Sequence, residues 1–213
     1  MTAQILISLG LAALLIVFYG VKIYNRLVEL KTRVGNGFAQ IEVQLKRRYD
    51  LIPNLVEAAK GYMKHERETL ESVIAARNRA ASALERLGFG KGSQNAAEGA
   101  GAEGAGVAGI AAINLAEGEL MSALSRFNVV MEQYPDLKAS ENVLALQEEI
   151  SGTENRVGFA RQGFNDNVAE FNAYRKSFPQ VIVANFTGFS RDEEFLQFAD
   201  SAKIQDAPKV SFN

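Results

Sequence analysis

The sequence predicts an all-α protein in which an N-terminal transmembrane helix continues into an antiparallel four-helix bundle containing two long helices. Residues 2–21 carry no charged side chain, and helical spacing of apolar residues then persists for tens of positions. A second long stretch repeats its apolar residues every seven positions. We therefore expect an anchor at residues 1–21, a helical bundle at residues 22–187 and a Phe-containing tail at residues 188–213.

The uncharged segment is long enough to cross a lipid bilayer. A helix rises about 1.5 Å per residue, so residues 2–21 match a hydrocarbon core of about 30 Å. A cleaved signal peptide is the alternative, but the segment has no basic residues before it and no clear small-residue cleavage site after it. We expect a retained, single-pass anchor.

Basic residues follow the apolar segment directly. Lys22, Arg26, Lys31 and Arg33 are opposed only by Glu29. By the positive-inside rule, the large domain is expected in the cytoplasm with the N-terminus outside. An exported domain on an N-terminal anchor is the alternative.

The next segment predicts a stiff stalk helix. Its apolar residues are spaced by three, four and four positions, an eleven-residue repeat that fits a nearly straight helix. They are Leu27, Leu30, Val34, Phe38, Ile41, Leu45, Tyr49 and Ile52. Pro53 lacks a backbone donor, so we expect a kink or break near it.

Two shorter helices are expected next. The second spans about residues 66–87, and residues 88–112, rich in Gly and Ala, read as a flexible connector. The third helix is expected to start near Asn114, with Glu117 completing a capping box, and Pro135 should stop it.

The fourth helix, over about residues 137–177, has the most regular pattern. Its seven-residue repeat consists of Val143, Ile150, Val157, Phe164, Phe171 and Phe178. After Pro179, the alternation of Val181, Val183 and Phe186 predicts a short strand-like segment. We expect the remaining Phe-rich tail to pack on the end of the bundle.

The composition argues against several functions. A net charge of −2 gives no general attraction for nucleic acid, and the absence of Cys removes thiol chemistry and Cys-based metal sites. The single histidine, His65, cannot supply a di-iron site, and no nucleophile elbow accompanies it. We expect no cofactor, no metal and no enzymatic activity, with His65 as a surface or hinge residue.

A charged run lies at the expected kink. It combines the cations Arg47 and Arg48 with the carboxylate of Asp50. We expect the run to form ion pairs with Glu148, Glu149 or Glu154 on the other long helix through its cations, which would fix register more than add stability. Contact with a partner or a lipid headgroup is the alternative.

Several motifs resemble the LemA family of bacterial membrane proteins, in order along nearly the whole chain. They are Tyr24 to Val28, Arg47 to Val56, Lys60-Gly61-Tyr62, His65-Glu66, Thr153 to Val157, including Arg156, Phe164-Asn165-Asp166, Phe171-Asn172 and Phe178-Pro179. The resemblance implies a location at the inner membrane of a bacterium, an N-terminal transmembrane helix and an antiparallel helical bundle, and it does not imply an enzyme. Relatives that include a magnetosome-formation protein suggest a role in membrane organisation.

The leading functional hypothesis is a scaffold that self-associates at the membrane. The short helices can cover only about half of the long ones, so Leu27, Leu30 and Val34 are expected to lack partners within one chain. An adaptor that presents the bundle or its tail to another membrane protein is the alternative. The candidate interaction or register residues are Leu27, Leu30, Val34, Arg47, Arg48, Asp50, Glu154, Arg156, Phe189 and Phe195.

Overall fold

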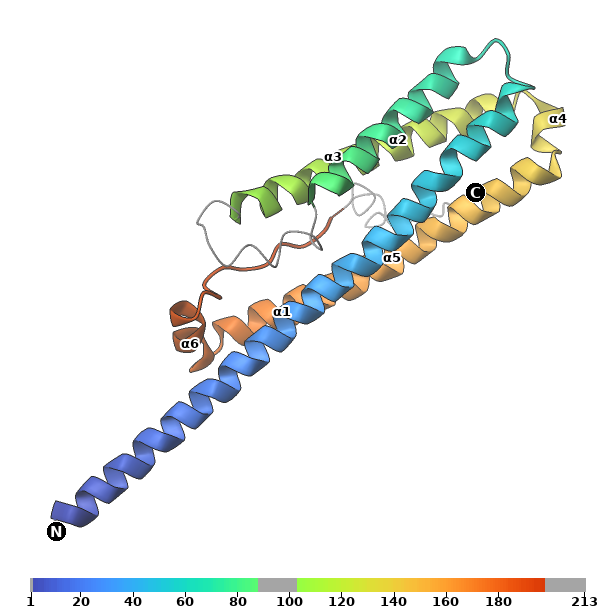
Figure 1. Ribbon diagram of the computed structural model, residues 1–213. Coiled ribbons are helices and arrows are strands. Elements are labelled where there is room, and N and C mark those ends of the chain that lie inside the picture. Colours follow the sequence, from blue (N-terminus) through green and yellow to red (C-terminus); the bar gives the residue numbers. More distant parts are fainter. Residues whose placement is uncertain (1, 88–102, 198–213) are drawn as a thin grey trace, which may run out of the picture. The chain divides into compact units, whose positions relative to one another are not determined.

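The computed structural model describes residues 2–87 and 103–197, and within them the chain is all-α, as predicted (Figure 1). Its helices are α1 (Thr2–Lys60), α2 (Arg67–Leu87), α3 (Glu103–Met131), α4 (Pro135–Lys138), α5 (Glu141–Lys176) and α6 (Gln180–Phe186). The arrangement of the entire chain as an antiparallel bundle stays a prediction.

Helix α1 continues through Pro53, so the expected break there is wrong. Proline removes the hydrogen bond that would end on the carbonyl of Tyr49, four residues earlier. The side chain of Arg77 on α2 supplies a substitute, because its Nε donates to the Tyr49 carbonyl oxygen at 2.8 Å. A neighbouring helix thus satisfies the acceptor that the proline leaves open.

Helix α3 begins earlier than the sequence predicted. It starts at Glu103, so residues 103–112 are helical rather than part of a connector, and residues 88–102 lie outside the described residues. Asn114 lies inside the helix, and the proposed capping box with Glu117 is therefore wrong. Alanine is the strongest helix former, and packing of α3 on α2 offsets the cost of its glycines.

The seven-residue repeat of α5 is confirmed over five of its six positions. Val143, Ile150, Val157, Phe164 and Phe171 are buried. Phe178 is 80% exposed, because α5 ends at Lys176 and the chain turns before the sixth position is reached.

The expected strand after Pro179 is wrong, since Gln180–Phe186 form α6. The helix ends in a Schellman-type turn, in which the Phe189 amide donates to the Ala184 carbonyl at 3.0 Å. Gly188 has φ = +85°, which this turn requires and which side chains disfavour.

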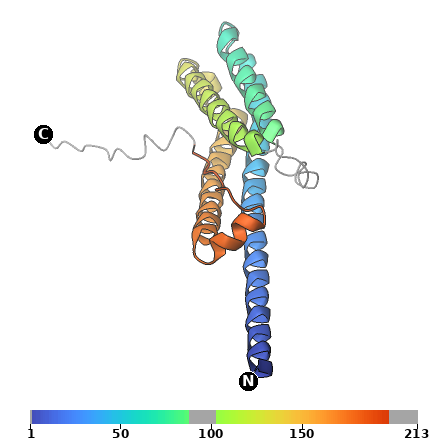
Figure 2. The ribbon, with the colours of Figure 1, turned by 90° about the vertical axis from the view of Figure 1, so that its left-hand side faces the viewer.

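The described chain divides into two compact units. Unit 1 joins the residues of α1 up to Gly37 to Gln162–Phe195, and unit 2 contains the rest. In unit 1, α1 packs against the last turns of α5 and against α6, which lies beside α1 in both views (Figures 1 and 2). At Gly37 the backbones come close: a Cβ there would lie 3.2 Å from Cα of Phe164.

Unit 2 contains α2, α3 and α4 with the adjoining parts of α1 and α5, and these helices share an apolar core. The turn of residues 61–66 reverses the chain between α1 and α2, and α4 connects α3 to α5 (Figure 1). Side-chain contacts join α1 to α2, α3 and α5, and α3 to α2 and α5. The largest buried apolar side chains of this unit are Phe38, Ile41, Leu45, Ile52, Met63, Ile113, Leu120 and Phe127.

Candidate functional site

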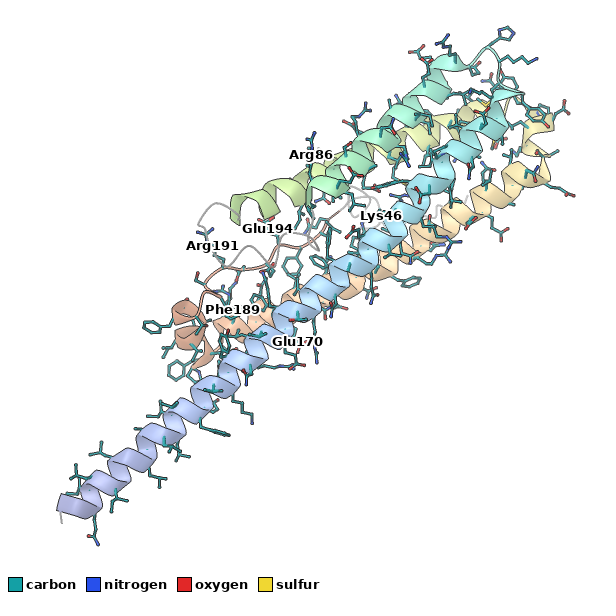
Figure 3. All side chains as sticks on the ribbon, viewed as in Figure 1. Lys46, Arg86, Glu170, Phe189, Arg191 and Glu194 are labelled. Carbon is teal, nitrogen blue, oxygen red and sulfur yellow. The ribbon has the colours of Figure 1, made fainter. Side chains whose placement is uncertain are left out.

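The first turns of α1 form an exposed apolar surface. Their side chains project outward with no other element around them (Figure 3). This is the one helix in the described residues long and apolar enough to cross a membrane, and its most apolar window is entirely unburied. The exposed side chains include Ile5, Leu9, Leu15, Phe18 and Val21. Such a surface is costly in water and favourable in lipid.

The apolar stripe after this segment is covered within the chain. Leu27, Leu30 and Val34 are almost completely buried in unit 1. The expectation that they lack partners within one chain is therefore wrong, because the end of α5, α6 and the residues after α6 fold over this part of α1. Because these side chains are buried within one chain, the stripe gives no support for self-association.

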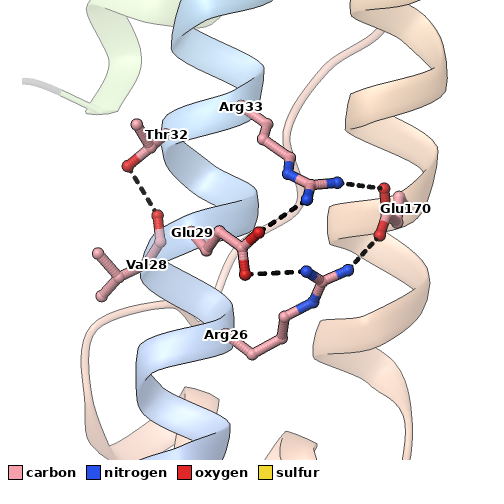
Figure 4. A network of polar contacts seen from close by, with 6 residues as sticks. All are labelled: Arg26, Val28, Glu29, Thr32, Arg33 and Glu170. Atoms are coloured by element: carbon pink, nitrogen blue, oxygen red, sulfur yellow. Dashed lines mark hydrogen bonds and ion pairs between the residues drawn. The ribbon is translucent and has the colours of Figure 1, made fainter.

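A lattice of four charged side chains joins α1 to α5 in unit 1 (Figure 4). Arg26 and Arg33 each bind both Glu29, at 2.8 and 2.7 Å, and Glu170, at 2.6 and 3.7 Å. Hydrogen bonds from Arg26, and next from Arg33, lower the pKa of Glu29. All four groups are partly exposed, so the lattice orients the helices more than it stabilises them.

The segment after α6 is held by polar contacts to α1 and α5. Asn172 on α5 donates to the Glu193 carbonyl at 2.8 Å and accepts from the Glu193 amide at 2.9 Å, and Lys31 pairs with the Glu193 carboxylate. Lys176, at 2.5 Å, and Arg175 bind Asp192 and lower the pKa of its carboxyl group, with the Lys176 hydrogen bond as the larger cause.

Phe189 belongs to an aromatic cluster beside the end of the apolar segment. Its ring centroid lies 6.0 Å from that of Tyr24 on α1 and 6.3 Å from that of Phe171 on α5. The ammonium of Lys31 lies 5.8 Å from the Phe171 centroid, within range of a cation–π contact. Phe189 is thus partly packed within the chain, whereas Phe195 is exposed.

Unit 2 contains a buried polar cluster centred on Glu117 of α3. Arg48 and Tyr49 of α1 both bind the Glu117 carboxylate, as an ion pair and as a hydrogen bond donated by the tyrosine hydroxyl. The three residues are at most 3% exposed. Burial raises the pKa of Tyr49 to about 12. The cluster ties α1 to α3 at a fixed register.

The other members of the charged run contact different helices. Arg47 pairs with Glu149 on α5 at 2.5 Å, one of the expected partners. Arg48 instead binds Glu117 on α3, so the expectation that these ion pairs reach α5 is wrong for Arg48. The Asp50 carboxylate lies 3.5 Å from Arg77 on α2. Glu154 is exposed on α5.

A shallow groove in unit 2, about 590 Å³ in volume, lies between α1 and α5. It is lined by Ala39, Gln40, Val43, Gln44, Arg156, Phe159 and Ala160. Val43 and Phe159 are 61% and 76% exposed, so the groove presents two large apolar side chains beside two alanines. Arg156 thus lies in a surface groove.

Two features escaped the sequence analysis. Glu117 was assigned to a helix cap, although its spacing from Ile113 and Leu120 puts it on the apolar face of α3, a signal for a buried carboxylate. Ile182 and Phe186, read within a strand-like pattern, are one helical turn apart and both exposed.

The sequence analysis considered a metal site and the role of His65, and both concern the described residues. No group of three or more metal-binding side chains occurs among them. His65 is exposed in the turn before α2, as expected of a surface or hinge residue.

Comparison with known proteins agrees with the predicted resemblance. A family model described as the LemA family matches residues 37–212. Magnetosome protein MamQ of Magnetospirillum gryphiswaldense is 25% identical over 174 residues, which are 81% of this chain and 64% of the relative. Magnetosome proteins MamQ 1 and MamQ 2 of Paramagnetospirillum magneticum are each 24% identical over 176 residues, 82% of this chain and 65% of each relative. The match spans just under two thirds of the length of these curated relatives. Since the family model covers well over half of its residues, the chain belongs to the LemA family.

Proposed function

We propose that this chain is a non-enzymatic structural protein that residues 2–21 anchor in a membrane and that associates there with further copies of itself. The exposed apolar part of α1 is the observation that carries the anchoring. An apolar helix of about 30 Å matches a bilayer core and would otherwise remain in contact with water. The structural role is part of this proposal, and the similarity to magnetosome proteins is compatible with it.

The groove between α1 and α5 in unit 2 is the proposed contact surface. It carries both projections, Val43 and Phe159, and recesses, Ala39 and Ala160. A two-fold contact brings the same patch from two copies together, so each Phe159 would enter the recess of the other copy. Anchoring in one membrane raises the effective concentration of copies and favours a contact of modest area.

Light scattering of the full-length protein in detergent tests self-association. At micromolar concentration we expect a protein mass of two or more chains, each of 23.2 kDa. Phe159→Ser should reduce it, whereas Val129→Ser, at a similarly exposed site on α3, should not. A strictly monomeric mass would exclude self-association. Cross-linking from Phe195 to a different protein would instead favour the adaptor function.

The cytoplasmic location of the domain is also part of the proposal. It rests on Lys22, Arg26, Lys31 and Arg33 following the apolar segment. Because the chain has no Cys, a single engineered thiol at Glu154 reports topology without background. An impermeant reagent should not label it in intact cells, and strong labelling would place the domain outside.

A further inference from the structure

We infer that α6 and the turn before it form a second membrane contact, in which Phe178, Ile182 and Phe186 insert into the lipid interface beside the span. These three residues form what we name the apolar foot of unit 1. The inference rests on the proposed anchoring of α1.

The apolar foot is the most exposed apolar surface of unit 1 outside the span. Phe186 is 87% exposed and Phe178 80%, more than any other large apolar side chain in the described residues. Ile182 and Phe186 are four residues apart, so they share one face of α6. Ala184, on another face of α6, is fully buried. The helix is therefore amphipathic, with an inner face packed on unit 1 and an outer face without partners within the chain as described.

The height of α6 along α1 coincides with the end of the span. Val21 is exposed, whereas Ile23 is the first largely buried apolar side chain of α1. The ring of Phe189, three residues after Phe186, contacts Tyr24 at 6.0 Å. Tyr24 lies about 4.5 Å beyond Val21 along the helix. The headgroup layer is roughly 5 to 7 Å thick on each side of a bilayer, so Tyr24 and the segment beside it lie at headgroup level.

Both views agree with this placement. The junction of α5 and α6 lies at the end of unit 1 from which the exposed part of α1 projects (Figures 1 and 2). A membrane around residues 2–21 would therefore meet this junction. Apolar side chains at that depth enter the boundary between headgroups and acyl chains.

The surrounding charges suit a lipid surface. Lys22 is an exposed cation at the end of the span, and such a group attracts anionic headgroups. The nearby carboxylates of Asp192 and Glu193 are engaged in ion pairs with Lys176, Arg175 and Lys31, which reduces their repulsion of those headgroups. Tyr24 is itself a residue type enriched at the membrane interface.

Tryptophan fluorescence in lipid vesicles tests the inference, because the chain contains no Trp. The full-length protein is reconstituted in phosphatidylcholine and phosphatidylglycerol, with and without acyl-chain bromination, which quenches Trp within the bilayer. Four single-Trp variants are compared: Phe186→Trp and Phe178→Trp in the apolar foot, Phe18→Trp in the span, and Val129→Trp in unit 2. Val129 is a suitable control, because it is 66% exposed and lies on α3, outside the proposed contact surface.

We expect brominated lipid to remove most of the emission of Phe18→Trp, a substantial part of that of Phe186→Trp and Phe178→Trp, and little of that of Val129→Trp. The foot variants should also emit at shorter wavelength than the control. Equal quenching of foot and control would overturn the inference while leaving the anchor intact. A blue-shifted foot that lipid does not quench would mean a protein occupant and would also overturn it. Absence of quenching at Phe18→Trp would instead refute the anchoring itself. Far-ultraviolet circular dichroism verifies that each variant is folded.

Discussion

The buried pair of Arg48 and Glu117 permits a quantitative test of how α1 and α3 are held together. The two side chains are 3% and 2% exposed, so neither charge can be hydrated when its partner is removed. Breaking a buried ion pair by deleting one member typically costs about 3 to 5 kcal/mol. We therefore expect Arg48→Met and Glu117→Leu each to lower the free energy of unfolding by that amount.

Removing the whole cluster should have a much smaller effect. The variant Arg48→Met, Tyr49→Phe, Glu117→Leu removes the buried carboxylate together with both of its partners, and apolar side chains of similar size fill the space. Such replacements are often neutral or stabilising by about 1 to 4 kcal/mol. If the two single variants act through the same ion pair, their costs will be strongly non-additive.

The assay is urea unfolding of the full-length protein in detergent, followed by far-ultraviolet circular dichroism. The matched control is Arg79→Met with Glu119→Leu, because this pair joins α2 to α3 at 2.7 Å but is 58% and 55% exposed. Exposed pairs contribute about 0 to 1 kcal/mol, so the control variants should differ little from the unmodified protein. If the single changes at the buried pair are as mild as the control, or if their costs simply add in the combined variant, the reasoning fails.

Four further predictions use the same unfolding assay. Arg77→Leu removes the donor to the Tyr49 carbonyl and should lower the free energy of unfolding by about 1 to 3 kcal/mol. An unchanged free energy of unfolding would show that water replaces the arginine. A Cβ at Gly35 would meet no other atom, so Gly35→Ala should stabilise α1 by up to about 1 kcal/mol. A Cβ at Gly37 would meet α5, so Gly37→Ala should stabilise the protein less or destabilise it. Equal effects of the two changes would contradict the close approach of α1 and α5 at Gly37. Gly188→Ala should cost roughly 1 to 2 kcal/mol because φ is positive there, and a neutral result would argue against the turn. Because burial raises the Tyr49 pKa from 10.0 to about 12, the unfolded state ionises first as the pH rises. The contribution of Tyr49 to the free energy of unfolding is therefore fully present below about pH 10. It decreases by ~3 kcal/mol in total as the pH rises from about 10 to about 12. Tyr49→Phe should remove this part of the pH dependence.

The repeating patterns predicted the fold class well. The seven-residue repeat of α5 identified Val143, Ile150 and Val157 as core residues, and all three are buried. It failed at Phe178, because the chain leaves the helix just before that position. The apolar repeat of α1 likewise identified buried residues, since a helix with one apolar face must pack that face on something.

The candidate site was harder to predict because its partners are distant in sequence. Local rules predicted a kink or break near Pro53, but α1 continues through it, and the missing hydrogen bond is replaced by Arg77 from another helix. They assigned Glu117 to a cap, although its partners are Arg48 and Tyr49, more than 60 residues away. The spacing of Glu117 signals its burial, but nothing in the neighbouring sequence identifies the partner in either contact.

The sequence by itself determined that this chain is helical, that it begins with a segment suited to a bilayer, and which residues of each helix avoid water. These properties follow from periodicity and composition, which are local. Only the tertiary structure decided what those faces meet: the stripe of Leu27, Leu30 and Val34 is covered within the chain, while Phe178 and Phe186 remain exposed. The physical reason is that burial depends on which segments fold back over a surface, and short segments such as α6 fold where their contacts with the rest of the chain place them.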